Sequence, residues 1–411
     1  MSTAQQTSLG HIRVLDLSRV LAGPWCSQNL ADLGADIIKI ERPGGGDDTR
    51  AWGPPYARDA EGANTSEAAY YLAANRGKRS VTCDIASPEG QALVRELAAH
   101  ADVVLENFKV GQLKRYGLDY ESLKAIKPDL VYCSVTGFGQ DGPYAHRAGY
   151  DFLIQGMGGF MSITGERDEL PGGGPQKAGV AIVDLMTGMY ATVAVLAALT
   201  HRDRTGEGQY IDMALLDVQV AMLANMASNY HNTGAAPRRY GNAHANIVPY
   251  QTFATSDGHI IVATGNDGQY VKFVQAGEAP ELARDERFIT NPLRVKNRAI
   301  LVPLLEAMVA RFTRDDWIAR LEAVGVPCGP INDLADVFAN EQVVARGMAV
   351  DLPHPAAGKV TLVRSPMKMS GTPVGATLAP PLLGQHTDEV LREVLGKSAD
   401  EIEALKANKI V

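Results

Sequence analysis

Cysteine is scarce in this chain of 411 residues. Its four cysteines, Cys26, Cys83, Cys133 and Cys328, lie far apart, and none belongs to a CxxC pair or to a cysteine–histidine spacing of the zinc type. The nine histidines are scattered singly. The sequence therefore argues against a disulfide framework and offers no metal site, and we expect reduced cysteines in a cytoplasmic protein.

The chain also lacks an excess of positive charge and an evident membrane segment. Its formal net charge of −8 gives no global electrostatic reason to expect nucleic acid or an anionic membrane as a partner. We find no apolar run that approaches the roughly 20 residues needed to span a bilayer. The first residues, MSTAQQTSLGHIRVLDLS, have neither an apolar signal core nor an Arg-rich amphipathic stretch. We expect a globular protein without nucleic acid or membrane as a partner.

Several common catalytic signatures are missing. The sequence contains no GxSxG elbow, no GxxxxGK[ST] phosphate loop, no HExxH pair and no GxGxxG after the first predicted strand. An α/β pattern in this chain therefore does not by itself indicate a nicotinamide dehydrogenase, which stays only as a general alternative.

Short β-branched runs alternate with amphipathic segments over the first 140 residues, as a parallel βαβ sheet requires. The length exceeds what one hydrophobic core usually organises, so we expect two domains. The predicted fold class is α/β, with a Rossmann-like parallel-sheet large domain over residues 1–228. An inserted smaller α+β domain follows over 229–328, and a C-terminal segment, 329–411, rejoins the large domain. The periodicity predicts strands at 12–17, 36–41, 80–85, 102–108, 129–136 and 359–363, and helices at 24–33, 88–101, 185–200, 299–312, 316–324 and 387–395.

Asp184 stands out in AGVAIVDLMTGMYATVAVLAAL, where it precedes a long apolar helix. A carboxylate in such apolar surroundings needs hydrogen-bond donors or an opposite charge close to it. An aspartate at a helix start caps free backbone N–H groups, and the local sequence favours this role over a catalytic one. The two roles are compatible, because N–H groups that keep the carboxylate ionised would lower its pKa and leave it a nucleophile.

Basic residues follow several predicted strands. In open α/β sheets ligands bind at the carboxyl edge, and cations that converge there suit a phosphate-bearing ligand. For each of them a solvated surface position is an equally good interpretation. They are Arg42, Lys78, Arg79, Lys109, Arg115 and Arg147.

Seven stretches, taken in order, resemble the family III (CaiB/BaiF type) CoA-transferases over essentially the whole chain. Each is weak alone, but seven in order are highly specific. The resemblance implies an enzyme that moves CoA between carboxylic acids, with no tightly bound cofactor, with the CoA thioester as a substrate, and as an interlocked homodimer. The stretches are RVLDLSRVLAGPWCSQNLADLGADIIKIERPGGGDDTR, ANRGKRSVTCDIASPEG, DVVLENFKVGQLKRYGLDY, GFGQDGPYAHRAGYD, RTGEGQYIDMALLD, GVPCGPIND and PPLLGQHTDEVL.

A residue-by-residue match with the family implies the site. The catalytic aspartate falls on Asp184, whose carboxylate would attack the acyl-CoA thioester and carry CoA as an aspartyl-CoA thioester. The implied CoA contacts are Leu21, Ala22, Arg42, Cys83, Asp84, Ala86, Asn107, Phe108, Lys109, Arg115, Arg147, Tyr150 and Asp151.

Differences from particular branches of the family narrow the range of expected substrates. Leu21 stands where the formyl-CoA branch has glutamine, which argues against formyl-CoA and oxalate. The stretch 238–266 resembles the branch that uses succinyl-CoA with glutarate or hydroxymethylglutarate, and His244, Arg238 or Arg239 would anchor the second carboxylate. Tyr150 stands where the racemase branch has histidine, and tyrosine, with a pKa near 10, is a poorer proton shuttle. A 2-methylacyl-CoA racemase-like enzyme and a non-catalytic CoA-binding protein stay as alternatives.

Overall fold

The structure is a computed structural model that describes residues 7–375 and 377–411. The chain divides into two compact units. The first combines the chain up to residue 159 with residues 178–225 and 342–411, and the second combines 160–177 with 226–341. The domain boundaries expected at 228 and 328 stay a prediction.

A six-stranded sheet forms the centre of the first unit, with every neighbouring pair parallel. The predicted α/β fold with a parallel sheet is confirmed. Its strand order is β5-β2-β1-β6-β7-β8, so β2 and β5 follow on one side of β1, whereas β6, β7 and β8 follow on its other side. The side on which successive strands are added therefore reverses between β1 and β6. In open α/β sheets such a reversal leaves a crevice outside the carboxyl ends of the two strands, where ligands bind. The strands are β1 (Arg13–Asp16), β2 (Asp36–Glu41), β5 (Lys78–Thr82), β6 (Val103–Glu106), β7 (Val131–Thr136) and β8 (Tyr210–Ala214).

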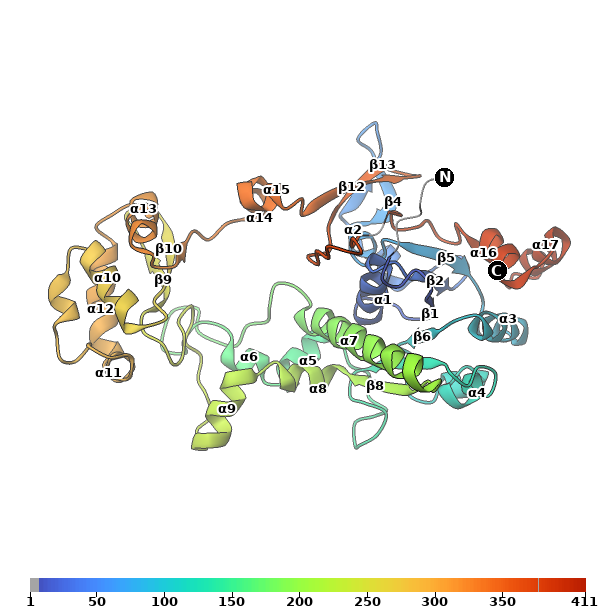
Figure 1. The fold of residues 1–411 in the computed structure, drawn as a ribbon, viewed down its shortest axis with the longest axis horizontal. Helices are drawn as coiled ribbons and strands as arrows, with labels where there is room; N and C mark the ends of the chain where they lie inside the picture. Colours follow the sequence, from blue (N-terminus) through green and yellow to red (C-terminus); the bar gives the residue numbers. More distant parts are fainter. Residues whose placement is uncertain (1–6, 376) are drawn as a thin grey trace. The chain divides into compact units, whose positions relative to one another are not determined.

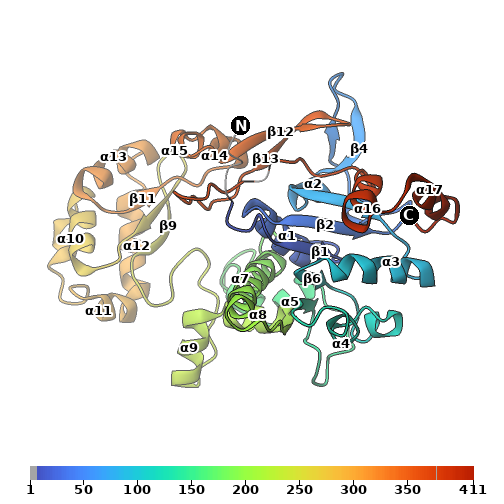
Figure 2. The same ribbon diagram turned by 45° about the vertical axis from the view of Figure 1, so that its right-hand side comes forward.

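Helices cover both faces of this sheet. On one face α1 (Ala22–Asp32) and α7 (Ile182–Thr205) lie side by side (Figure 1), and Leu30 and Val195 join the core against the strands. The other face holds α3 (Pro88–Ala99), α4 (Tyr120–Lys124), α16 (Thr387–Leu395) and α17 (Ala399–Ala407) (Figure 2). Ser87 is the N-cap of α3, and its hydroxyl accepts from Gly90 N–H. The helix buries Leu93 and Leu97 on one side.

Helix α7 corrects the expectation that no segment is long and apolar enough to cross a membrane. By length and composition alone its 24 residues pass that test. However, 44% of its most apolar stretch is buried, and a Cβ at Gly188 would lie 2.7 Å from the Ala22 carbonyl oxygen of α1. A core helix of a globular protein passes the same test, and α7 packs as one.

The stretch between β2 and β5 is structured. It contains η1 (Asp48–Ala51), β3 (Tyr56–Arg58), β4 (Asn64–Ala68) and α2 (Ala69–Ala73). Strands β3 and β4 pair antiparallel, as do β12 (Ala349–His354) and β13 (Gly358–Val363), and Tyr71 and Leu352 belong to a small core between these segments. The remaining elements of the first unit are η2 (Leu113–Tyr116), α5 (Asp151–Met157) and α8 (Leu215–Ala221).

The second unit is built on a three-stranded antiparallel sheet of β9 (Tyr250–Ala254), β10 (His259–Ala263) and β11 (Cys328–Gly329). Phe253, Phe273 and Trp317 are buried at its core. Helices α9 (Ala224–Thr233) and α15 (Glu341–Ala345) stand where the chain passes between the units. The other helices are α6 (Phe160–Ile163), α10 (Asp267–Ala276), η3 (Pro280–Ala283), α11 (Asn291–Lys296), α12 (Arg298–Val309), α13 (Arg314–Val324) and α14 (Leu334–Ala339).

Candidate active site

Two adjoining cavities open at the carboxyl edge of the parallel sheet, where the strand order reverses. The first, of about 1000 Å³ with its open mouth, is lined by residues 19–22 after β1 and 107–110 after β6. The second, of about 810 Å³, lies at the ends of β2 and β5. Arg19, Phe108 and Gln112 line both, so the cavities form one groove.

Asp184 lines the first cavity. It lies in the first turn of α7, is only 8% exposed, and its carboxylate accepts no hydrogen bond from the described part of the chain. Burial, together with the negative charge of Asp151, raises its pKa to about 7. The expectation that Asp184 caps the helix and has a lowered pKa is therefore wrong.

Asp151 caps α7 instead. Its Oδ1 accepts from the N–H of Val183 at 2.8 Å and from that of Asp184 at 3.4 Å. Gln155 Nε2 donates to Asp151 Oδ2 at 2.6 Å, and Gln155 Oε1 accepts from Ala178 N–H at 2.9 Å. Asp151 was expected as a CoA contact, but its side chain is committed to the helix start. It fixes the position from which Asp184 faces the cavity.

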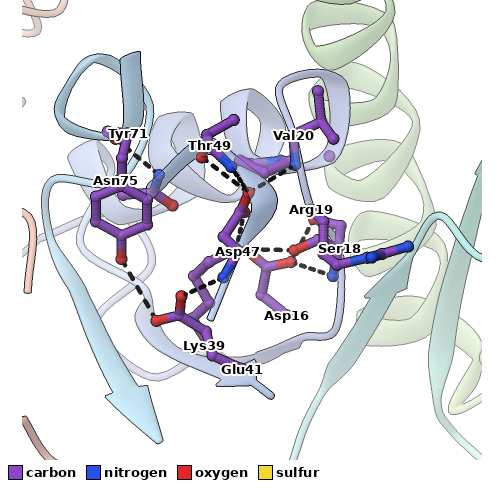
Figure 3. Close-up of polar contacts among 12 residues, drawn as sticks. Asp16, Ser18, Arg19, Val20, Lys39, Glu41, Asp47, Thr49, Tyr71 and Asn75 are labelled. Atoms are coloured by element: carbon purple, nitrogen blue, oxygen red, sulfur yellow. Dashed lines mark hydrogen bonds and ion pairs between the residues drawn. The ribbon is translucent and has the colours of Figure 1, made fainter. Parts of the chain in front are cut away.

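The loop after β1 is held by a buried polar network (Figure 3). Val20, which lines the first cavity, has φ 71°, a left-handed conformation that β-branched residues rarely adopt. Its N–H donates to Asp47 Oδ1 at 3.2 Å, and Lys39 Nζ donates to the Ser18 carbonyl at 2.8 Å. Arg19 N–H donates to the side chain of Asn107 at 2.9 Å. Such strain persists only when surrounding contacts over-determine the backbone.

Four fully buried charges form the centre of this network. Lys39 Nζ lies 3.0 Å from Asp47 Oδ2, and Lys78 Nζ lies 3.4 Å from Asp16 Oδ2. Burial alone would raise the pKa of Asp16, but Lys78 and Lys39, together with hydrogen bonds from Ser18 and Ser27, outweigh burial and the pKa is lowered. Burial lowers the pKa of Lys78 to about 7. The candidate role of Lys78 in phosphate binding is wrong, because its side chain is internal. Arg79 is likewise occupied, by Asp36 at 2.6 Å.

Basic side chains line the groove. Arg42 lines the second cavity, Lys109 and Arg147 line the first, and Arg19 lines both. Within the described residues Arg42, Lys109 and Arg147 form no ion pair, and Arg147 stacks over the Tyr144 ring at 4.5 Å. Arg19 pairs with Asp48 at 3.0 Å, so the cations available to a phosphate-bearing ligand are Arg42, Lys109 and Arg147.

Most of the expected CoA contacts come together here. Arg115, in η2, lines neither cavity and is exposed. Cys83 lines the second cavity as an uncharged thiol, because burial raises its pKa to about 12. The expected contacts that line the first cavity are Leu21, Ala22, Asn107, Phe108, Lys109, Arg147 and Tyr150, and those that line the second are Arg42, Cys83, Asp84, Ala86 and Phe108.

Sequence reasoning missed two groups in the surroundings of Asp184. Arg19 lies three positions after the end of β1, where the strand order reverses, and its place after the first predicted strand was an available signal. Tyr70, on α2, lies close enough to Asp184 and Asp151 that, after burial, their charges raise the pKa of its hydroxyl. Its position inside a long loop gave no signal.

The three expected acceptor anchors belong to the second unit. Arg239 is occupied, because it pairs with Asp168 and donates to the carbonyl of Glu166 at 3.2 Å. His244 Nδ1 accepts from a neighbouring backbone N–H. Arg238 has no carboxylate partner among the described residues and stacks on Tyr240 at 5.6 Å.

Comparison with known proteins decides the family. The family model "CoA-transferase family III" matches residues 9–387. The chain belongs to this family. It is 52% identical to the succinate–glutarate CoA-transferase of Agrobacterium fabrum over 94% of this chain and 95% of that protein. The succinyl-CoA:glutarate CoA-transferase of Homo sapiens is 43% identical over 93% of this chain and 85% of that protein.

Solved structures agree. The crystal structure of a CAIB/BAIF family protein from Brucella suis has a TM-score of 0.83 at 53% identity and covers 95% of this chain and 100% of that chain. Rv3272 from Mycobacterium tuberculosis has a TM-score of 0.81 at 30% identity, over 94% of this chain and 99% of that chain. The chain is thus a family III CoA-transferase, whose substrates are acyl-CoA thioesters, and the predicted enzyme class is confirmed.

Proposed function

We propose that this CoA-transferase moves CoA from succinyl-CoA to glutarate or a closely related dicarboxylic acid, with Asp184 as the nucleophile. One observation carries the proposal: the buried carboxylate of Asp184, with no hydrogen bond from the described chain, faces a groove whose lining includes Arg42, Lys109 and Arg147, which form no ion pair among the described residues. The substrate pair is supported by the relatives, which act on succinyl-CoA or succinate and glutarate by name.

The first half of the reaction transfers CoA to the enzyme. The Asp184 carboxylate attacks the thioester carbonyl, which gives a succinyl–aspartyl anhydride and the CoA thiolate. The thiolate then attacks the aspartyl carbonyl and releases succinate, which leaves an aspartyl-CoA thioester. A raised pKa suits this role, because a more basic carboxylate is a better nucleophile once ionised.

The second half repeats the chemistry with the acceptor. The glutarate carboxylate attacks the aspartyl-CoA thioester, which gives a glutaryl–aspartyl anhydride and the CoA thiolate. The thiolate attacks the glutaryl carbonyl, which releases glutaryl-CoA and restores the Asp184 carboxylate. One thioester replaces another, so the reaction needs no further energy source.

Trapping of the intermediate tests this proposal. Incubation with succinyl-CoA followed by hydroxylamine is expected to convert Asp184 into a hydroxamate, which peptide mass mapping detects. Added glutarate is expected to remove the labelling by discharging the thioester. Glu106 is an internal control, because burial raises its pKa to about 7 as well, yet it lines neither cavity of the groove. Labelling of Glu106 instead, or no labelling at all, would contradict the proposal.

We further propose a homodimer in the cytoplasm. Neighbouring helices α5, α7 and α8 expose large apolar side chains, and contiguous apolar surface of this kind marks interfaces. All four cysteines are free, as expected in a reducing compartment. The exposed apolar residues are Phe152, Leu153, Met157, Met189, Tyr190, Val193 and Val220.

Light scattering tests the dimer. The wild-type chain is expected at twice the monomer mass of 44.0 kDa. Val193→Asp places a charge on the exposed face of α7, where Val193 is 60% exposed, and is expected to shift the protein towards the monomer because a buried unpaired charge is costly. Val363→Asp, a 54% exposed control on β13, is expected to keep the wild-type mass. A monomeric wild type would refute the dimer.

A further inference from the structure

The turn that follows β6 in the first unit stands between two cavities. Phe108, Lys109 and Val110 line the first cavity of the groove. The same three residues also line a third cavity of about 810 Å³, measured with its open mouth. Because this turn has open space on two sides, side-chain packing restrains it less than it restrains a buried segment. Its position therefore depends strongly on polar contacts.

Two polar contacts hold the turn from opposite sides. Asn107 joins it to the loop after β1, because its Oδ1 accepts from Arg19 N–H at 2.9 Å and its Nδ2 donates to the Arg19 carbonyl at 2.7 Å. From the strand side, Glu106 Oε2 accepts from Phe108 N–H at 2.7 Å. Glu106 thus holds the backbone of the residue whose ring lines both cavities of the groove.

The Glu106 carboxyl is itself fixed to neighbouring strands. Glu106 is the last residue of β6 and is only 6% exposed. Ser134, its neighbour on β7, hydrogen-bonds to Glu106 Oε1, and Gln140 Nε2 donates to Ser134 Oγ at 2.8 Å. Gln140 N–H donates in turn to Asp212 Oδ2 of β8 at 2.9 Å. This network ties the turn to the carboxyl ends of β6, β7 and β8.

A carboxyl at this position costs the fold stability. Burial raises the pKa of Glu106 to about 7, although the hydrogen bonds from Ser134 and Phe108 oppose the shift. Glu106 forms no ion pair among the described residues, so no counter-charge offsets its burial. The three residues before it in β6 are apolar and buried. An apolar side chain at the strand end would avoid the cost, but it would leave Phe108 N–H without this acceptor.

From this geometry we infer that Glu106 is a positioning residue for CoA. Through Phe108 N–H it fixes the turn from which Asn107, Phe108 and Lys109 line the groove. Glu106 lines neither cavity of the groove, so it acts through the backbone of the turn. The identification of the ligand as CoA rests on the function proposed above.

Binding of free CoA, measured by calorimetry, tests this role together with steady-state kinetics. In Glu106→Ala we expect the CoA dissociation constant and KM for succinyl-CoA to rise about tenfold, with kcat within about threefold of the wild type, because the turn is misplaced while Asp184 is untouched. Glu106→Gln keeps a carbonyl oxygen for Phe108 N–H, and both constants should stay within about threefold of the wild type. Unchanged constants in Glu106→Ala, or an equal rise in both variants, would overturn the inference.

Two further variants separate positioning from folding. Tyr132 is buried beside the third cavity, and its hydroxyl donates to the Leu118 carbonyl at 3.0 Å. Tyr132→Phe should therefore lose stability in urea but keep the wild-type CoA dissociation constant. A smaller folded fraction lowers kcat and leaves KM unchanged, so destabilisation alone does not produce the expected result. If Glu106→Ala does not fold, Glu106→Met, which fills more of the space without an acceptor, carries the same expectation and the same refuting outcome.

The two proposals fail in different experiments. If wild-type Asp184 forms no hydroxamate, the proposed nucleophile is wrong. The CoA dissociation constants of the Glu106 variants require no chemical step, so they decide the positioning role whether or not Asp184 is labelled.

Discussion

Asp184→Asn is expected to lower CoA transfer by at least about a thousandfold, because an amide cannot form the anhydride and thioester intermediates. The loss should appear in kcat, while CoA binding stays close to the wild type. The groove's cations, Arg42, Lys109 and Arg147, are untouched by the change. Activity within tenfold of the wild type would exclude Asp184 as the nucleophile.

The same variant is expected to be at least as stable as the wild type. Asp184 accepts no hydrogen bond from the described chain, and burial raises its pKa from 3.8 to about 7. Between these values the native state retains a proton that the unfolded chain has released, so stability falls as pH rises from about 4 to 7. At higher pH the full cost of the buried charge is present, at most about 4 kcal/mol. The neutral amide of the Asp184→Asn variant would not carry this cost.

Two pH series test the expectation that the Asp184 carboxylate is needed for activity but lowers the stability of the fold. The free energy of unfolding of the wild type, measured in urea, should fall relative to the Asp184→Asn variant as pH rises from 4 to 7 and stay parallel to it above that. The kcat/KM for succinyl-CoA in the wild type should rise with pH and level off above about 7, because that parameter reports ionisation in the free enzyme. A parallel pair of stability curves over the whole range would contradict the raised pKa.

Lys39→Met is expected to destabilise the protein by about 3–5 kcal/mol, because it leaves a buried carboxylate without its partner. Lys39 and Asp47 are both fully buried, and Lys39 also donates to the carbonyl of Ser18. Loss of these contacts should release the strained backbone at Val20, so KM for the acyl-CoA should rise in addition to the loss of stability.

A double variant and a surface control sharpen this test. Lys39→Met with Asp47→Asn removes both charges, and we expect it to be more stable than Lys39→Met alone. Lys359→Met breaks an exposed pair with Asp351 and should cost no more than about 1 kcal/mol. A cost for Lys39→Met as small as that of the surface control would contradict the role of the network.

Hydrophobic periodicity identified much of the fold. The strand at 36–41 and the helix at 387–395 have the predicted bounds. The strand predicted at 80–85 is instead Lys78–Thr82, because its pairing with β2 continues back to Lys78, a buried lysine that the periodicity did not include. A parallel α/β pattern was readable because strand and helix periods differ, but strand order depends on pairing between segments far apart in the chain.

The sequence by itself determined the alternation of strands and helices and the family resemblance, which in turn suggested Asp184 as the nucleophile and the set of CoA contacts. Only the tertiary structure decided that the strand order reverses between β1 and β6 and so creates the groove. It also decided that Asp151, 33 positions before Asp184, caps α7, while the carboxylate of Asp184 accepts no hydrogen bond from the described chain and has a raised pKa. Hydrogen-bond partners and burial are properties of contacts distant in sequence, and no local pattern encodes which carboxylate meets the helix start.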